Sequence, residues 1–315
     1  MKLKHFSLIY FITGIFLYGS GFSIIFKLCK NDSWIAILIG GTISCIVLPI
    51  YKKILNKNNK FIKLINVLFI LLINMIILRI FTTSFYLTKT PGLYITIPFI
   101  ILCIYNVSKK IDTLTKETTI LFFVSFFVIL LNLIASTKTG SISFFFPINL
   151  VKKVNLLKGI IFYIIYTLSP FILLSNIKID DKNYIKSFIF TNIFMIFISL
   201  IIIFVLGPNL ISIYRFPEYM IFKEINLFGF IENVENLVGL IYFLNLFVTS
   251  SLCVYNIKSI VNKKYIFIIL IAFIILLTEL ISDKYKCSFF IYKNLPIILL
   301  IFIVINIFIY ILKKE

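Results

Sequence analysis

Ten apolar runs, each about as long as a membrane-spanning helix, dominate the sequence. About 20 residues of helix cross the hydrocarbon core of a bilayer, so an apolar run of about 18 or more predicts a transmembrane helix. The runs cover residues 6–28, 34–51, 62–87, 91–107, 118–136, 157–175, 185–206, 234–257, 265–281 and 294–312. They are continuously apolar rather than alternating, which favours helices over a closed barrel. Since only 14% of the residues are charged, well below the usual content of soluble domains, we expect one all-α integral membrane domain over residues 1–315.

The positive charge of the chain lies between the apolar runs rather than on a separate soluble face. The formal net charge is +19, but its placement predicts no nucleic-acid partner and indicates the lipid bilayer as the surroundings. Lys and Arg are more numerous in one set of alternate loops, and such residues favour the cytoplasmic side. We therefore expect both termini on the cytoplasmic side. The first run is expected to remain as a helix, because no small-residue cleavage site follows it.

The first and sixth runs contain residues that interrupt helices. Gly14, Gly19 and Gly21 fall within eight residues of the first run, and Pro170 follows Ser169 in the sixth. Glycine weakens a helix, and proline removes a backbone donor. In five-helix inverted-repeat transporters, broken helices at corresponding positions form the substrate site. The alternative explanation is close packing of small residues together with an ordinary proline kink.

A few polar side chains lie inside the apolar runs. Asn74 is near the middle of the third run, and Asn245 and Thr249 share a face of the eighth. Amides in lipid need partners, so these side chains form either interhelical hydrogen bonds or ligand contacts. Arg79 and Glu279 are the charged residues most nearly within runs, and each is either functional or extended toward the interface.

Residues suited to catalysis are scarce. The single histidine, His5, lies in a short basic segment, which argues against His-based acid–base chemistry and Ser-His-Asp triads. The sequence contains no phosphate-binding glycine loop, and Asp180-Asp181 is explained by a solvated turn. The five cysteines have no metal-like spacing. We therefore expect no enzyme, no metal site and no cofactor.

One polar segment, residues 214–235, separates the seventh and eighth runs. It holds four of the twelve acids: Glu218, Glu224, Glu232 and Glu235. Glu232 and Glu235 stand three apart at the predicted start of a helix, where acids complement the helix dipole without any bound cation. We expect the segment to be an outward-facing cap, with Pro217, Glu232 and Glu235 as a gate or partner contact.

Several short motifs lie in this segment and elsewhere along the chain. They are Tyr214 with Phe216-Pro217, Phe230-Ile-Glu232-Asn-Val-Glu235, Tyr242-Phe-Leu-Asn-Leu-Phe247, Asp32-Ser-Trp34-Ile35 leading to Gly40-Gly41, and Gly207-Pro208. In order and spacing these motifs resemble the B-subunit family of bacterial spore germination receptors. That family is similar to ten-helix members of the amino acid–polyamine–organocation transporter superfamily. It commonly has Arg where this chain has Asn233 and Trp where it has Tyr242.

The resemblance implies a sensor in the spore inner membrane rather than a catalyst. Its members act with an A subunit and a C-subunit lipoprotein, and the B subunit binds a small germinant, commonly an amino acid. The implied fold has about ten transmembrane helices in a five-helix inverted repeat, with helices 1 and 6 broken. The candidate ligand-binding residues are Gly14, Tyr18, Gly19, Asn74, Thr167, Ser169, Asn245 and Thr249. Exposed half-helix N-termini would meet a ligand carboxylate, and freed carbonyls its ammonium group.

Two other functions are compatible with a chain of this kind. A secondary amino-acid transporter would share the fold and would differ by moving its substrate. The scarcity of acids within the runs weighs slightly against carboxylate-coupled proton symport. A polytopic acyltransferase has a similar number of spans, but the absence of His within or between the runs opposes it.

Overall fold

The fold is helical throughout the part of the chain that the computed structural model describes. It describes residues 3–108, 111–136, 140–146, 151–177, 181–221, 235–261, 263–283 and 285–312, and every regular element in these ranges is a helix. Within the same ranges, eight helical segments are long and apolar enough to cross a membrane. The all-α multi-pass class is therefore confirmed. The count of ten spans and the inverted repeat stay predictions.

The first two predicted spans form one apolar helical segment of 53 residues, His5–Lys57. It contains α1 (Leu3–Gly14), α2 (Phe22–Cys29) and α3 (Ser33–Lys57), joined by short turns. The fourth predicted span forms α5 (Leu93–Ser108), a shorter apolar helix. The other predicted spans lie in α4 (Lys60–Phe85), α6 (Ile111–Ser136), α7 (Lys153–Leu168), α8 (Asp181–Ile213), α10 (Glu235–Ile260), α11 (Lys264–Asp283) and α12 (Tyr285–Leu312).

The chain divides into two compact units, each built from stretches that are far apart in sequence. The first unit comprises Met1–Pro49, Thr118–Leu168 and Ile179–Leu244. The second comprises Ile50–Glu117, Ser169–Lys178 and Asn245–Glu315. The single membrane domain expected over residues 1–315 stays a prediction.

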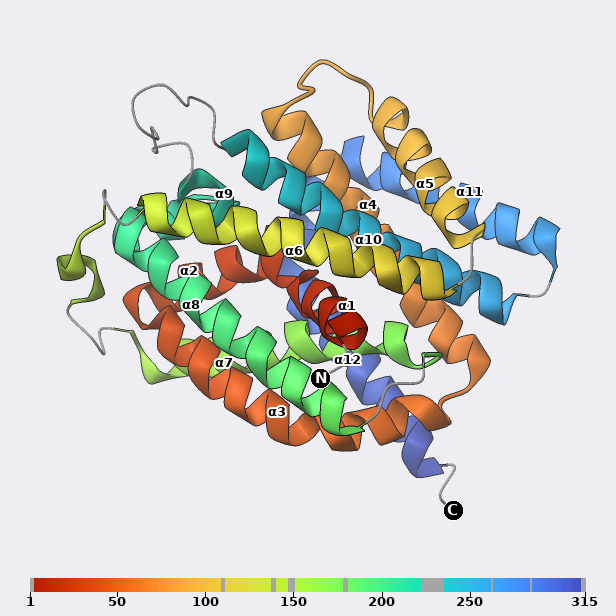
Figure 1. Ribbon diagram of the computed structural model, residues 1–315, viewed down its shortest axis with the longest axis horizontal. Coiled ribbons are helices and arrows are strands. Elements are labelled where there is room, and N and C mark those ends of the chain that lie inside the picture. Colours follow the sequence, from red (N-terminus) through yellow and green to blue (C-terminus); the bar gives the residue numbers. More distant parts are fainter. Residues whose placement is uncertain are drawn as a thin grey trace. The chain divides into compact units, whose positions relative to one another are not determined.

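In the first unit, helices from the beginning of the chain pack against α7 and α8. Helix α1 lies against α8, and α2 lies against both α7 and α8, as the ribbon in Figure 1 shows. Aromatic side chains fill this interior, because Phe6 and Tyr10 both place their rings edge-on to Phe122, at 4.8 and 5.0 Å between centroids. A Cβ atom on Gly40 would lie 2.9 Å from Tyr163, so a glycine there lets α3 approach α7 closely.

The first predicted span is broken where its glycines predicted a weak point. Between α1 and α2, Tyr18 is extended (φ −70°, ψ 127°) and Gly19 is left-handed (φ 91°, ψ −19°) inside the turn Leu17–Gly21. Because L side chains rarely adopt such a positive φ, glycine suits this position. We call Leu17–Gly21 the first-span break.

The sixth predicted span stays helical but changes from an α-helix to a 3-10 helix. Helix α7 ends at Leu168, and a 3-10 helix, Ser169–Leu174, continues it with Pro170 at its second position. A further kink, which the sequence did not lead us to expect, lies inside α8 at Gly207 (φ 68°, ψ 170°) just before Pro208. The proline cannot donate a backbone hydrogen bond, and the glycine takes up the change of direction.

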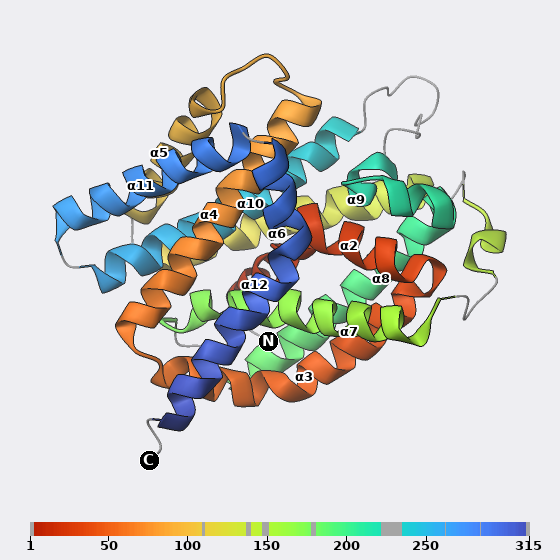
Figure 2. The same ribbon diagram turned by 180° about the vertical axis from the view of Figure 1, so that it is seen from behind.

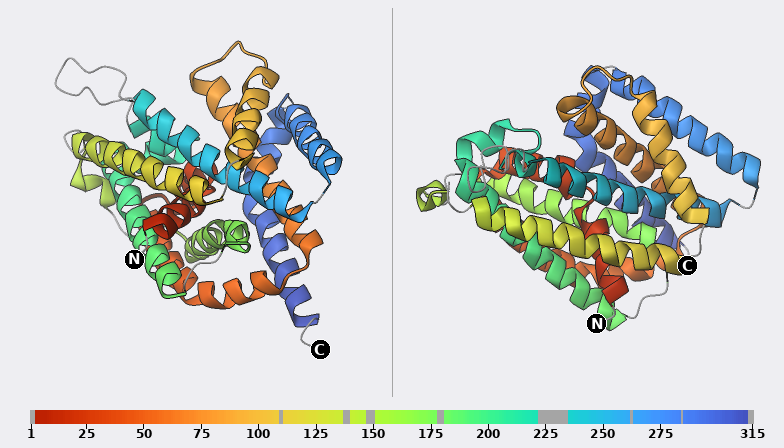
Figure 3. Two further views of the ribbon diagram at one scale, coloured as in Figure 1. Left: turned by 45° about the vertical axis from the view of Figure 1, so that its right-hand side comes forward. Right: turned by 45° about the horizontal axis from the view of Figure 1, so that its top comes forward.

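In the second unit, α4 and α11 form the most extensive pair. Helix α12 also contacts both α4 and α11, and the three are seen together in Figure 2. Helix α5 covers α4 and α11 from another side, as the right-hand view of Figure 3 shows. Side-chain amides also link α4 to α12. Asn66 of α4 and Asn58, just before α4, both donate to the Asn306 side-chain oxygen of α12, at 3.1 and 2.8 Å.

Candidate functional site

The first-span break is hydrogen-bonded to a carboxylate from the polar segment, that of Glu218. Helix α9 (Pro217–Met220) is a single turn that begins with proline at its first position, where the missing N–H costs nothing. It packs against α2 and α8. The turn holds Glu218 inside the first unit, where the residue is only 4% exposed.

Two residues donate hydrogen bonds to the same carboxylate oxygen of Glu218. The Gly19 N–H donates to Oε1 at 2.9 Å, and the Tyr242 hydroxyl donates to the same oxygen in a short contact. The second oxygen, Oε2, is buried and has no hydrogen-bond partner among the described residues. One side chain thus links the first-span break to the first turns of α10, within a single unit.

Burial dominates the electrostatics of this carboxyl. Desolvation raises the pKa of Glu218 from its ordinary 4.5 to about 7, although the hydrogen bonds from Tyr242 and Gly19 act in the opposite direction. A buried carboxylate is costly without a cationic partner, and the described residues offer Glu218 no ion pair. The group is therefore balanced between its acid and carboxylate forms near neutral pH.

Aromatic rings enclose the same place. The Tyr18 and Tyr242 rings lie 6.0 Å apart between centroids, and Phe216 meets Tyr242 edge-on at the same separation. Tyr18 also contacts Phe22 at 5.9 Å. The backbone of the polar segment is tied down nearby, because the Ser23 hydroxyl donates to the Tyr214 carbonyl at 3.1 Å. We call Gly19, Glu218, Tyr18, Phe216 and Tyr242 the Glu218 site.

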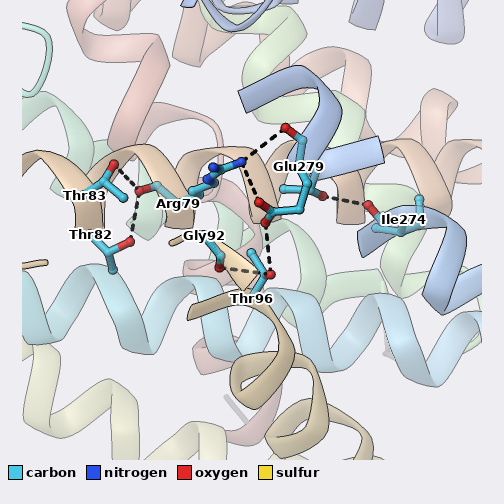
Figure 4. A network of polar contacts seen from close by, with 8 residues as sticks. Arg79, Thr82, Thr83, Gly92, Thr96, Ile274 and Glu279 are labelled. Atoms are coloured by element: carbon cyan, nitrogen blue, oxygen red, sulfur yellow. Dashed lines mark hydrogen bonds and ion pairs between the residues drawn. The ribbon is translucent and has the colours of Figure 1, made fainter. Parts of the chain in front are cut away.

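The second unit contains a different polar cluster. Arg79 on α4 and Glu279 on α11 form an ion pair of 2.9 Å, and their side chains are 11% and 15% exposed. Arg79 also donates to the Glu279 carbonyl at 3.3 Å, and the Thr96 hydroxyl donates to the Glu279 carboxylate at 3.4 Å. Figure 4 shows these side chains turned toward one another, with Gly92 beside them. A Cβ on Gly92 would collide with Arg79, so the glycine leaves room for the guanidinium.

This cluster shows an arrangement that neither interpretation of Arg79 and Glu279 had included. Each had been expected either to act in function or to extend toward the membrane interface. The structure pairs them between α4 and α11 and supplies Glu279 with Thr96 as a further donor. The ion pair joins the two helices, and a functional role of these residues stays a prediction.

The structure places the predicted ligand-binding residues in both units. Gly14, Tyr18, Gly19 and Thr167 belong to the first unit, whereas Asn74, Ser169, Asn245 and Thr249 belong to the second. Within the second, Asn74 donates to Thr249 and to Ser250, each at 3.3 Å. These are the interhelical bonds that buried amides were expected to make. The assembly of all eight residues into one pocket stays a prediction.

The hydroxyl groups of two predicted residues also donate to carbonyls of their own helices. The Thr167 hydroxyl donates to the Tyr163 carbonyl of its own helix at 2.9 Å, and Thr249 donates to the Asn245 carbonyl at 2.7 Å. The Ser169 hydroxyl is buried and has no hydrogen-bond partner among the described residues. Gly14 ends α1.

The predicted gate residues are described only in part. Pro217 is buried at the start of α9, Glu232 lies outside the described residues, and Glu235 begins α10 with its side chain outside them. Sequence reasoning recognised Glu218 only as one acid of the polar segment. The signal that could have identified it is a Pro-Glu pair flanked by aromatic residues between two apolar runs.

A comparison with protein families extends these observations to nearly the whole chain. A family described as spore germination protein has a sequence model that matches residues 3–284. The description names no catalytic activity. No curated protein matches the chain. The family match agrees with the resemblance drawn from the short motifs.

Proposed function

The chain belongs to the spore germination protein family, and on that premise we propose that it is the germinant-sensing membrane subunit of a spore germination receptor. It binds a small nutrient, an amino acid in our proposal, and signals to an A subunit and a C-subunit lipoprotein. It resides in the spore inner membrane with both termini on the cytoplasmic side. Pro217, Glu232 and Glu235 act as a gate or partner contact.

The observation that carries this proposal is the first-span break held by Glu218. An unwound segment inside a membrane helix exposes backbone N–H and C=O groups, which transporter folds use to bind small solutes. Here the break is real, since Tyr18 and Gly19 leave helical geometry. It is also linked to another element, because Glu218 bonds Gly19 and Tyr242 together.

The same link supplies a route for signalling. A ligand shifts an equilibrium only by its different affinity for two states. A solute that binds at the break would compete with, or add to, the bonds that Glu218 makes to Gly19 and Tyr242. The start of α10 would then be held differently with and without ligand. The partner subunits would respond to that difference.

Deletion of the chain, followed by germination assays against a panel of single nutrients, tests the proposal. We expect the response to one nutrient class to disappear while the response to non-nutrient triggers persists. The variants Gly14→Leu and Ser169→Phe, each expressed in the deletion strain, test the placement of the ligand. Unchanged responses in the deletion strain to every nutrient would contradict the proposed function.

A secondary amino-acid transporter is the second candidate, and Glu218 is the observation that favours it. The carboxyl is buried and its pKa is raised to about 7, so it could take up and release a proton during a transport cycle. Uptake of labelled amino acids into proteoliposomes, driven by a pH gradient, distinguishes this activity. Gradient-driven accumulation would identify a transporter, and binding without accumulation would identify a sensor.

A further inference from the structure

The Glu218 site already satisfies the donor that a ligand carboxylate was expected to use. A free half-helix N–H at the first-span break would attract an anionic group. In the structure that donor, the Gly19 N–H, is engaged by Glu218 Oε1 at 2.9 Å. A second carboxylate brought to this place would also face the first one, which is unfavourable for two like charges in a buried site.

What the site lacks is a partner for the other oxygen of Glu218. Oε2 is buried and finds no donor among the described residues. As a carboxylate, Glu218 therefore has an uncompensated charge, and as an acid it has an O–H without an acceptor. An incoming cationic donor would satisfy both the charge and the vacant oxygen.

The surrounding rings suit such a cation. Tyr242 bonds to Glu218 directly, Tyr18 precedes the bonded Gly19, and Phe216 lies two residues before Glu218. The faces of aromatic rings carry partial negative charge and attract ammonium groups. The rings also exclude water, which strengthens a charge-assisted hydrogen bond.

The charged neighbours of the site are few among the described residues. Arg215 lies on the polar segment with its guanidinium 5.8 Å from the centre of the Phe216 ring. Lys27 lies on α2 and interacts electrostatically with Arg215. Among the described residues, Glu218 is the acid bonded to the first-span break, through the Gly19 N–H.

We propose that the Glu218 site binds the primary ammonium group of the ligand, with Glu218 Oε2 as its acceptor and the Tyr18 and Tyr242 rings beside it. This inference rests on the proposed function and narrows its ligand to small molecules that carry a primary ammonium group. The sequence suggested freed backbone carbonyls as the partners of the ammonium group, whereas this inference gives that role to the Glu218 carboxylate.

Binding to the purified full-length chain in nanodiscs tests the inference. The probes are a panel of L-amino acids, each accompanied by the amine that lacks its carboxylate and the acid that lacks its ammonium group. For L-alanine these are ethylamine and propionate. We expect an amino acid and its matching amine to bind, and the matching acid to show no binding.

Glu218→Gln is the decisive variant, because it keeps the size of the side chain and removes its charge. We expect the affinity for the amine-bearing probes to fall roughly 10- to 100-fold, the effect of losing one charge-assisted bond. Glu117→Gln, which removes the same charge from α6, is the matched control and should bind as the wild type does. Glu218→Asp retains the charge, and a preference for amine over acid in this variant shows that the site is still folded.

The outcomes separate this inference from the proposed function. Equal binding of amine and acid by the wild type, or undiminished binding by Glu218→Gln, would overturn the ammonium site. If the deletion strain loses its response only to a nutrient without an ammonium group, the inference fails and the sensor function stands. If Glu218-dependent amine binding is found but every germination response survives deletion, the inference stands and the sensor function fails.

Discussion

Two carboxylates, one in each unit, illustrate two uses of a buried charge. Glu279 in the second unit pairs with Arg79 at 2.9 Å and also accepts from Thr96. Glu218 in the first unit accepts from a backbone N–H and a phenol, and its second oxygen has no partner among the described residues. The carboxylate of Glu279 is therefore paired with a cation inside the protein, whereas that of Glu218 has no cationic partner among the described residues. On this difference rests our proposal that Glu218 binds a ligand, whereas Glu279 joins α4 to α11.

The largest loss of stability is expected from breaking the ion pair between Arg79 and Glu279. Arg79→Ala leaves Glu279 without its cation, which should destabilise the folded protein by about 3 kcal/mol. The midpoint of thermal unfolding in detergent measures this loss. The double variant Arg79→Ala with Glu279→Gln is the control, and it should recover most of the stability because no unpaired charge remains. An unchanged midpoint in Arg79→Ala would show that the pair does not hold α4 to α11.

The burial of Glu218, which has no cationic partner in the described part of the chain, should make the stability of the protein depend on pH. The folded-state pKa of Glu218 is about 7, above its ordinary 4.5, so the folded state binds this proton more tightly than the unfolded state does. Stability from this group is then present below 4.5 and is lost as the pH rises through about 7, by roughly 3 kcal/mol in all.

The difference between wild type and Glu218→Gln isolates that contribution from all other groups. We expect the unfolding midpoint of the wild type to fall more steeply than that of Glu218→Gln as the pH is raised over this range. An ammonium ligand selects the charged carboxylate, so its affinity for the wild type should instead rise with pH. Parallel stability curves for the two proteins would contradict the assigned burial of Glu218.

The geometry that presents the Gly19 N–H should depend on glycine. Gly19 has φ 91°, and an L side chain there costs roughly 1 to 2 kcal/mol. Gly19→Ala should therefore lower the unfolding midpoint and weaken ligand binding together. Gly14→Ala is the matched control for the unfolding midpoint alone, because Gly14 is itself a candidate ligand-binding residue and the positive-φ glycines do not include it. If both variants behave alike, the first-span break is not held in this conformation.

The smallest loss of stability is expected from removing the hydrogen bond that Thr96 donates to Glu279. Thr96→Val removes one neutral donor to Glu279 while Arg79 stays in place, which should cost about 1 kcal/mol. Thermal unfolding measures it, and ligand binding should remain at the wild-type level. A loss of binding in Thr96→Val would join the second cluster to function and remove the contrast between the two carboxylates.

Sequence reasoning reached the helical class and the position of the first-span break. Continuous apolar runs allow little besides membrane helices, and three clustered glycines mark a place where a helix is easily interrupted. For Asn74 it left interhelical bonding and ligand contact open, and the structure shows interhelical bonds to Thr249 and Ser250. The kink at Gly207 was visible only as a motif, since a glycine before proline does not reveal by itself how far a helix bends.

Tyr18 and Gly19 were predicted from the sequence, but their pairing with Glu218 was not, for a physical reason. Gly19 and Glu218 are 199 residues apart, and no periodic pattern links them. The polar segment was expected to be an outward-facing cap, yet the single turn of α9 carries Glu218 into the interior of the first unit. The pairing of Arg79 with Glu279 was hidden in the same way, because the two residues lie 200 positions apart on different helices.

Nutrient-triggered germination of spores that carry Glu218→Gln tests whether Glu218 binds the germinant. The variant replaces the deleted wild-type chain, with Glu117→Gln as the matched control and protein levels equalised. We expect Glu218→Gln spores to lose the response to the ammonium-bearing nutrient and to keep the response to non-nutrient triggers, while control spores respond fully. A normal nutrient response in Glu218→Gln spores would show that Glu218 does not bind the germinant.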